Sequence, residues 1–199
     1  MFTLATPTAD AIQRQIIRAA GLPAGTPRLL SLSDGILAGA QLPFGFARDI
    51  SRSHLGVGAA AFAAARTAFT RWVTFDIGWV RVANPEAPIA ADQVVAVEAH
   101  TLGLWTLNLS RIVETIDSPT RFGFLYATTA MHVEEGEERF VVELDPANGD
   151  VWYEVEAISR PRTLLARIGL PITRAFQHRF AWDSHRRMRE AVLASKTTS

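Results

Sequence analysis

Alternating apolar and polar residues dominate the middle of the chain. In 121–128 the aromatic residues Phe122, Phe124 and Tyr126 share one face with Thr128. A repeat of two residues is typical of a half-buried strand, since successive side chains point to opposite faces of a sheet. The pattern predicts strands over 74–82, 93–100, 104–117, 121–129, 139–144 and 151–158. The turn signal Pro146-Ala-Asn-Gly149 predicts a hairpin between the last two, and the series indicates an antiparallel meander.

Helical spacing of apolar residues marks both ends of the chain. Residues 10–20 and 58–72 have apolar positions on one helical side, and residues 43–56, with Pro43, Gly45 and Gly56, are typical of a loop. After residue 161 a stripe recurs every four residues: Leu164, Ile168, Ile172, Phe176, Phe180, Ser184, Met188 and Val192. Gly169 and Pro171 divide it, which predicts a short helix and then a long one from residue 171 to about residue 194.

Size and composition place the chain in the α+β class. Its 199 residues, of which 48% are hydrophobic, are enough for one domain, so we expect 1–199 to be a single domain with 1–56 packed on it as an extension. The 20 basic residues balance the 20 acidic ones, which gives no reason to expect a nucleic-acid partner. The chain has no cysteine and no long apolar run, so we expect a cytoplasmic protein without a membrane span.

Charge is unevenly distributed along the second half of the chain. The charged residues of 134–156 are all acidic apart from Arg139, whereas residues 159–199 are rich in arginine. The favoured interpretation is that acidic strands pair with a basic helix across their contact. The alternative is a basic face for a phosphate or an acidic partner.

One stretch, 126–138 (YATTAMHVEEGEE), combines groups that could carry acid–base chemistry. Histidine is a residue type suited to acid–base work, and Tyr126, Thr128 and Glu134 lie close to His132 in sequence. The alternative is a hairpin loop with solvated glutamates and an exposed histidine. We also considered a metal site made by His178, His185 and Asp183, against a solvated helix face, which we favour.

Arg111 and the tryptophans are candidates for binding a ligand. Arg111 interrupts a stretch that otherwise resembles a strand. An inward-pointing arginine needs a carboxylate or an anionic ligand, whereas an outward-pointing one is ordinary, and the sequence favours neither. Tryptophans such as Trp105 are typical of a core or of an apolar cavity, and the sequence leaves both open. The chain contains no GxGxxG, P-loop, HExxH or GxSxG motif, which argues against nucleotide enzymes, zinc proteases and α/β-hydrolases.

Several blocks together resemble a bacterial and plant family, domain of unknown function 1990. They are LGVGAAAFAAARTAFTRW, GWVRV, LGLWTLNLSRIV, RFGFLYATTAMHVEEGEERFVVE, VWYEVEAISRP and PITRAFQHRF, and they span about residues 12–192. The family is grouped with the Bet v 1-like, START-like (SRPBCC) helix-grip proteins. The resemblance therefore implies a curved antiparallel sheet wrapped around a long C-terminal α-helix.

The central block resembles the family pattern GFAYGTLPGHPExGEExF only in part. His132, Glu134, Glu137 and Glu138 match it, as does Arg111 elsewhere. This chain lacks the glycine and the prolines that the pattern has at Ala127, Ala130 and Val133. Because such residues fix special backbone angles, the loop here is expected to differ from that of its relatives.

Fold and residues together predict a protein that holds a small, largely apolar molecule between sheet and helix. The predicted ligand-binding residues are Arg111, Trp105, Phe124, Thr128, Phe176 and Phe180. The alternative is a cofactor-independent enzyme of the lyase, isomerase or hydrolase type, with His132, Glu134 and Tyr126 as catalytic residues and Arg111 beside them. A third possibility is an interaction module that presents its basic helix. We expect no metal and no cofactor, and the sequence leaves homo-oligomerisation open.

Overall fold

A single antiparallel sheet organises the fold, which is known from a computed structural model that describes residues 2–24, 28–33, 35–36, 41–132, 134–161 and 170–197. Its strand order is β4-β10-β9-β8-β7-β6-β5, and β1 pairs with β7. The strands are β1 (Phe2–Thr3), β4 (Ala47–Val57), β5 (Val80–Val82), β6 (Val94–Thr101), β7 (Leu104–Asp117), β8 (Arg121–Thr128), β9 (Glu134–Leu144) and β10 (Asp150–Pro161). A separate two-stranded sheet pairs β2 (Leu30–Ser31) with β3 (Gly35–Ile36).

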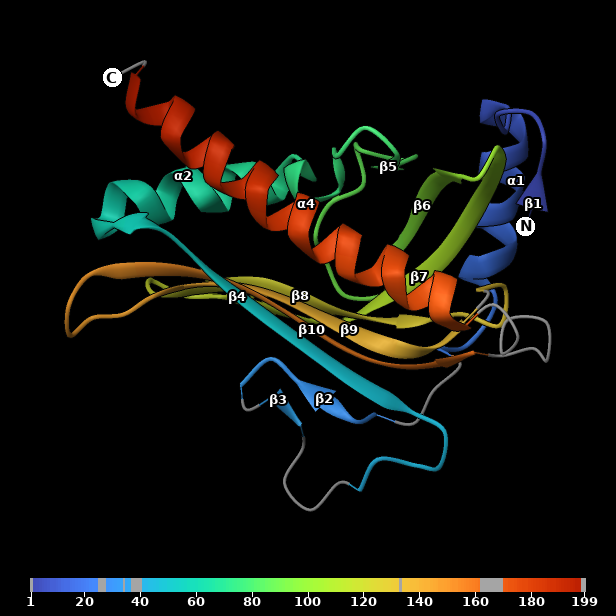
Figure 1. Ribbon diagram of the computed structural model, residues 1–199, viewed down its shortest axis with the longest axis horizontal. Helices are drawn as coiled ribbons and strands as arrows, with labels where there is room; N and C mark the ends of the chain where they lie inside the picture. The colour runs from blue at the N-terminus through green and yellow to red at the C-terminus, as the bar shows by residue number, and fades with distance from the viewer. Residues whose placement is uncertain are drawn as a thin grey trace.

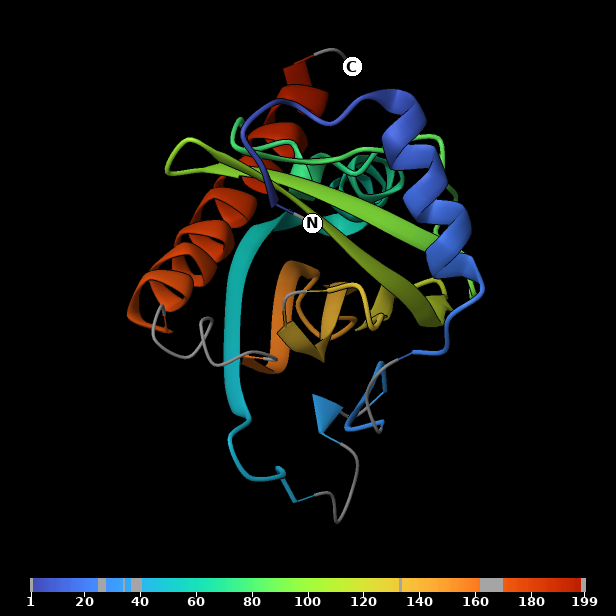
Figure 2. The ribbon, with the colours of Figure 1, turned by 90° about the vertical axis from the view of Figure 1, so that its right-hand side faces the viewer.

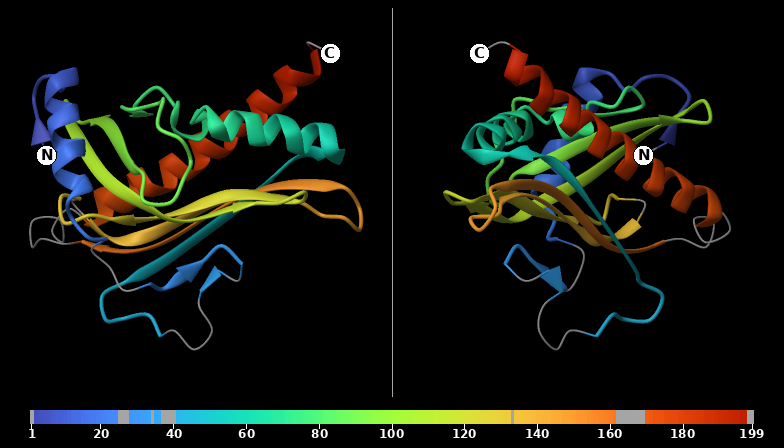
Figure 3. Two further views of the ribbon diagram at one scale, coloured as in Figure 1. Left: turned by 180° about the vertical axis from the view of Figure 1, so that it is seen from behind. Right: turned by 60° about the vertical axis from the view of Figure 1, so that its left-hand side comes forward.

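The helices and the small second sheet lie on different sides of this curved sheet. On the concave side, α4 (Leu170–Thr197) runs diagonally across the sheet beside α2 (Gly58–Thr70), and the short helix η1 (Val73–Phe75) follows α2 (Figure 1). On the opposite, convex side lie β2 and β3 (Figure 3). Helix α1 (Ala9–Ala20) packs outside β6 and β7 (Figure 2). This arrangement is the predicted α+β helix-grip: a curved sheet around a long C-terminal helix.

The main core fills the concave side beneath α2. Phe69 and Trp72 are buried against Phe124, and Tyr153 lies edge-on to Phe69. Met188 and Val192 of α4 are fully buried in the same cluster, which bears out this part of the predicted apolar stripe. The short helix expected just before α4 falls on residues 162–169, outside the described residues.

Most predicted strands are confirmed, with changes at their ends. β7 has the predicted bounds, and β8 and β10 nearly so. The predicted inward face of β8 is also confirmed, because Phe122, Phe124 and Tyr126 all belong to the concave core. β9 begins five residues earlier than predicted, at Glu134 rather than at Arg139. The prediction of one strand over residues 74–82 is wrong. The helix η1 occupies the start of this range, and of these residues only β5 pairs with β6.

The predicted loop over 43–56 is wrong in its second half. Residues 47–57 form β4, an eleven-residue edge strand that pairs with β10 from Asp150 to Ser159. Its exposure alternates between half-buried and exposed, but its half-buried positions include Asp49, Ser51 and Ser53. Polar residues on that face hid the alternation on which the strand predictions rest.

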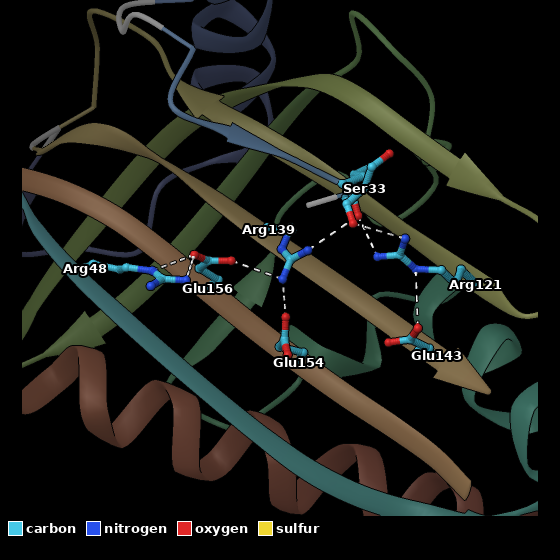
Figure 4. Close-up of polar contacts among 8 residues, drawn as sticks. Ser33, Arg48, Arg121, Arg139, Glu143, Glu154 and Glu156 are labelled. Carbon is cyan, nitrogen blue, oxygen red and sulfur yellow. Dashed lines mark hydrogen bonds and ion pairs between the residues drawn. The ribbon is translucent and has the colours of Figure 1, made fainter. Parts of the chain in front are cut away.

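The strand glutamates of the convex face pair with arginines that are not on the C-terminal helix (Figure 4). Glu156 is fully buried and lies 2.7 Å from Arg48 and 3.1 Å from Arg139, and Arg139 also pairs with Glu154. Helix α4 instead directs Arg174 to Asp49, at 3.6 Å. The interpretation that the acidic strands pair with the basic helix is therefore wrong, because the outward glutamates and α4 lie on opposite sides of the sheet.

A short segment, which we call the strap (residues 28–33), covers part of the convex face. Leu29, Leu30 and Leu32 are buried there against Leu125 and Ile158. The carboxylate of Glu137 accepts hydrogen bonds of 2.8 Å from the N–H groups of both Leu29 and Leu30. Arg121 and Arg139 donate to the carbonyl oxygen of Leu32. The buried glutamates of this face therefore have structural partners.

Candidate functional site

A cavity of about 270 Å³ lies between the concave face of the sheet and the N-terminal half of α4. Its walls come from β4, β6, β7, β8, β9 and β10, from the stretch of 75–80 and from α4. The exposed side chains of Ile50 and His178 line it as well, so the cavity meets solvent between β4 and α4.

Aromatic and aliphatic side chains form one part of the wall. Trp79 lies 5.7 Å from Phe176, and Phe75 lies 5.5 Å from Phe180, measured between ring centroids. Val97 and other small apolar residues of the strands complete this part. A mainly apolar wall with a few placed polar groups is the usual composition of a small-molecule site.

Polar side chains occupy the opposite part of the wall and follow from strand alternation. Within β6, β7, β8 and β10 the lining residues lie two apart, as in Asn108 and Ser110 of β7 and Tyr126 and Thr128 of β8. The register places Ser110 opposite Thr128 and Tyr126 opposite Glu138 of β9. The polar groups therefore form a continuous row across three neighbouring strands.

Tyr126 and Glu138 form a buried pair at this row. The hydroxyl of Tyr126 donates a hydrogen bond to Oε2 of Glu138. Burial raises the pKa of Glu138 to about 7, an effect that the hydrogen bond from Tyr126 opposes and the nearby Glu134 reinforces. Burial also raises the pKa of Tyr126 well above its usual value. Glu138 can thus hold or release a proton near neutral pH, whereas Tyr126 stays a hydrogen-bond donor.

Glu134 links the sheet to the helix at the edge of the cavity. Both of its carboxylate oxygens accept hydrogen bonds from Nε2 of Gln177, at 3.1 and 3.0 Å. Burial raises the pKa of Glu134, and the bonds from Gln177 and Ser159 and the charge of Arg174 act against this rise. Glu134 is therefore held in place by α4 and is not a solvated loop residue.

His132 lines the cavity from the turn that precedes β9. Its Nδ1 accepts a hydrogen bond of 3.0 Å from the backbone N–H group of Glu134. The backbone N–H group of His132 donates to the carbonyl oxygen of Thr129. The turn thus orients the ring while the side chain reaches the cavity. The cavity therefore brings together all three predicted catalytic residues, Tyr126, His132 and Glu134, and their catalytic role stays a prediction.

The structure separates the six predicted ligand-binding residues into two groups. Thr128, Phe176 and Phe180 line the cavity. Phe124 is fully buried at the other end of the concave face, where it packs against Trp72 at 5.3 Å and lies outside the cavity wall. Trp105 stacks on His100 of the neighbouring strand at 4.6 Å, also outside the wall.

Arg111 requires the largest correction among the site residues. Its guanidinium donates to the carbonyl oxygens of Ala19, Ala20 and Leu22, at 3.2, 2.8 and 2.7 Å, at the C-terminal end of α1. It therefore satisfies the last carbonyl groups of a helix on the outside of β7. The prediction that Arg111 holds an anion in the cavity is wrong in its location.

Several cavity residues were missed because their strands or partners were not recognised. Asp49 and Ser51 lie on β4, the strand that was interpreted as a loop. Asn108 lies between Leu107 and Leu109, two buried residues of the opposite face of β7. Gln177 of the helix was missed because its partner, Glu134, lies in the first part of β9, which was not predicted as a strand.

His185 forms a second polar contact between helix and sheet. Its Nε2 lies 2.8 Å from the Oγ of Ser51, and its Nδ1 lies 2.8 Å from the Oγ of Ser53. Burial lowers its pKa to about 4, with a smaller contribution from Arg189. The interpretation of His185 as part of a solvated helix face is therefore wrong.

The described residues contain no group of three or more histidine, cysteine, aspartate or glutamate side chains arranged to hold a metal ion. None of the helices in the described part of the chain has the length and apolar character needed to cross a membrane.

Comparison of the fold with solved structures supports the helix-grip architecture. The aromatase/cyclase di-domain protein StfQ of the steffimycin biosynthetic pathway matches with a TM-score of 0.52 and 8% sequence identity. The match covers 76% of this chain and 52% of that protein. At this identity the likeness concerns the fold alone.

Sequence relatives occur in eukaryotes. A UPF0548 protein of Dictyostelium discoideum is 36% identical over 155 residues, which are 72% of each chain. The UPF0548 protein At2g17695 of Arabidopsis thaliana is 30% identical over 157 residues, 76% of each chain. Residues 33–187 match the family described as domain of unknown function (DUF1990). With the predicted blocks, the helix-grip sheet and this match in agreement, the chain belongs to the DUF1990 family.

Proposed function

We propose that this protein binds a small, largely apolar molecule in the cavity between the sheet and α4. The observation that carries the proposal is the cavity itself, about 270 Å³ in volume, with an aromatic wall facing a row of buried polar groups. Apolar area gives a ligand its binding free energy, and a few polar groups fix its orientation. The Tyr126–Glu138 pair and the Glu134–Gln177 contact supply such groups.

Native mass spectrometry of the purified protein tests this proposal directly. A bound molecule gives an excess over the mass of the bare chain, and the excess disappears on denaturation. Ala157→Trp places a large side chain in the cavity wall and is expected to abolish the excess mass. Ala59→Trp, on the exposed side of α2, is the matched control and should leave it unchanged. An excess mass that survives Ala157→Trp would place the molecule elsewhere and contradict the proposal.

A second candidate function, a cofactor-independent enzyme of the lyase, isomerase or hydrolase type, has one specific observation in its favour. A buried carboxyl group with a pKa of about 7, such as Glu138, is suited to give or take a proton at neutral pH. Tyr126, His132 and Glu134 lie in the same cavity, whereas Arg111 does not take part. If the bound molecule is converted by the wild-type protein and not by Glu138→Gln, the enzyme is the better description. Location in the cytoplasm stays a prediction, and homo-oligomerisation stays open.

A further inference from the structure

The charge inside the cavity has one sign. The cavity-lining residues include Asp49, Glu134, Glu137 and Glu138, and none of the lining residues in the described part of the chain is a lysine or an arginine. Two of these acids are satisfied by the protein: Glu137 by the strap on the convex side, and Glu134 by Gln177. Asp49 lies at the mouth, where Arg174 approaches it to 3.6 Å.

Glu138 is the acid that the protein leaves without a compensating cation. Its hydrogen-bond donor is the neutral hydroxyl of Tyr126, and no lysine or arginine of the described residues forms an ion pair with it. An ionised carboxylate in such a place is costly unless an opposite charge accompanies it. A cation supplied by the bound molecule would remove that cost.

A second group of the same wall also lacks a donor. Oδ1 of Asn108 is buried and accepts no hydrogen bond. Asn108 lies two residues from Ser110, which pairs with Thr128, and Thr128 lies two residues from Tyr126, the partner of Glu138. We name Asn108, Ser110, Thr128 and Glu138 the acceptor row. A buried carbonyl oxygen without a donor is unusual in a native structure, and a ligand with N–H groups would satisfy it.

We propose that the molecule bound in this cavity is a cationic amphiphile: an apolar body with a protonated amino group that lies on the acceptor row. The inference rests on the proposed function and adds the chemical class of the ligand. The apolar body packs between Trp79, Phe176 and Phe180. The ammonium group donates to Glu138, and it supplies several donors where a hydroxyl supplies one.

Anionic ligands are disfavoured by the same geometry. A carboxylate placed on the acceptor row would set a second negative charge beside Glu138 and Glu134 in a poorly solvated site, which costs free energy for both groups. A neutral alcohol meets no such repulsion but leaves Glu138 uncompensated. Affinity should therefore fall from amine to alcohol to carboxylate when the apolar body is the same.

Octylamine, octanol and octanoate are probes that differ only in the head group. Calorimetric titration of the wild-type protein is expected to give octylamine the tightest binding, by about tenfold or more over octanol, and octanoate the weakest. Octanol binding as tightly as octylamine, or octanoate binding best, would overturn the inference and leave the proposed function intact. Failure of all three probes would count against the proposed function itself.

Glu138→Gln removes the charge and keeps the shape of the side chain. In this variant octylamine should lose about tenfold in affinity, while octanol stays within about twofold of the wild type. An unchanged preference for octylamine in Glu138→Gln would refute the role of Glu138, provided that thermal unfolding shows the variant folded.

The pH dependence of wild-type binding gives a test that needs no variant. Octylamine stays protonated between pH 6 and 8, as a lysine side chain does, whereas Glu138 ionises around its pKa of about 7. Octylamine should therefore bind more tightly at pH 8 than at pH 6. Other titratable groups that face Glu138 or line the cavity are Tyr126, Glu134, Glu137, His132, Asp49 and His178, with Tyr153 and Arg174 nearby. Because Glu138→Gln keeps all of them, a pH effect that persists in this variant would contradict the assignment to Glu138.

Discussion

The Nε2 atom of His185 on α4 lies 2.8 Å from the Oγ of Ser51 on β4. The ring is buried, and its other nitrogen lies equally close to the Oγ of Ser53. This contact fixes the C-terminal helix to the edge strand that forms one wall of the cavity. It depends on a neutral imidazole, because a cation buried beside two hydroxyl groups would lack a carboxylate partner.

Acid should weaken this attachment. Burial lowers the pKa of His185 from 6.5 to about 4, so the folded state resists protonation while the unfolded state accepts a proton below pH 6.5. The contribution is complete above pH 6.5 and is lost as the pH falls toward 4, on the order of 2 kcal/mol in the free energy of unfolding. Urea unfolding of the wild type and of His185→Gln across this range measures it. The two proteins should differ most in slope between pH 6.5 and 4, and equal slopes would contradict the prediction.

Glu138 is expected to affect stability in the opposite direction. Its pKa is raised from 4.5 to about 7, so the unfolded chain ionises first and stability falls as the pH rises through this interval. The loss amounts to roughly 3 kcal/mol. Glu138→Gln should therefore unfold at a higher urea concentration than the wild type at pH 8 and at nearly the same one at pH 4.5. A variant less stable than the wild type at pH 8 would show that the carboxylate has a partner.

Replacing Arg111 should loosen α1 and leave the cavity unaffected. Arg111→Met removes the donors to Ala19, Ala20 and Leu22, which is expected to cost about 1–3 kcal/mol because the last carbonyl groups of the helix, two of them in partly buried bonds, lose this partner. Hydrogen exchange should accelerate first in Ala9–Ala20. Probe binding should stay the same. Loss of probe binding without faster hydrogen exchange in α1 would show that Arg111 does act in the binding site.

The ion pairs of the convex face should matter more than those on the exposed side of α4. Arg139→Met removes the buried partner of Glu154 and Glu156 and is expected to cost about 3 kcal/mol, because Glu156 stays buried with Arg48 alone. Arg186→Met is the matched control, since Arg186 is half-exposed and its pairs with Asp183 and Glu190 lie on one helix. It should cost less than about 1 kcal/mol. Equal losses in thermal unfolding would refute the distinction.

Gly136 sits where two strands leave no room for a side chain. A Cβ atom there would overlap the carbonyl oxygen of Ile158 and the side chain of Ser159. Gly136→Ala should thus displace β9 from β10, destabilise the protein by more than about 2 kcal/mol and weaken probe binding, since Gly136 lines the cavity. In Gly21→Ala the nearest atom lies 3.7 Å away, so this control should change stability by less than about 0.5 kcal/mol. A Gly136→Ala variant as stable as this control would contradict the packing.

Prediction from sequence succeeded where every second residue of a strand is a large apolar one. β8 shows this best, because Phe122, Phe124 and Tyr126 are buried on one face. It failed at β4, where the inward residues are polar and the edge position leaves the other face exposed. For the same reason Asn108 was missed: on β7 the leucines Leu107 and Leu109 face α1 outside the sheet, and the polar residues face the cavity. Arg111 continues the leucine face, which explains its outward location.

The candidate site was predicted in part because its residues lie close together in sequence. Tyr126, Thr128, His132 and Glu134 belong to one pair of neighbouring strands and their connection, so a local cluster in sequence is also a cluster in space. Residues that reach the cavity from elsewhere, such as Asp49 and Gln177, depend on strand order and on helix position. Neither quantity can be derived from local spacing alone.

The strap is attached to the sheet through its main chain. Glu137 and Glu114 accept hydrogen bonds from the N–H groups of Leu29, Leu30 and Leu32, and Arg121 donates to a carbonyl oxygen. These bonds do not depend on which side chains stand at residues 29–32. Substitution of Leu29, Leu30 and Leu32 is constrained mainly by the need for apolar bulk, so this face can accept a different segment during evolution, or a grafted one in the laboratory, while the sheet beneath it keeps its own residues.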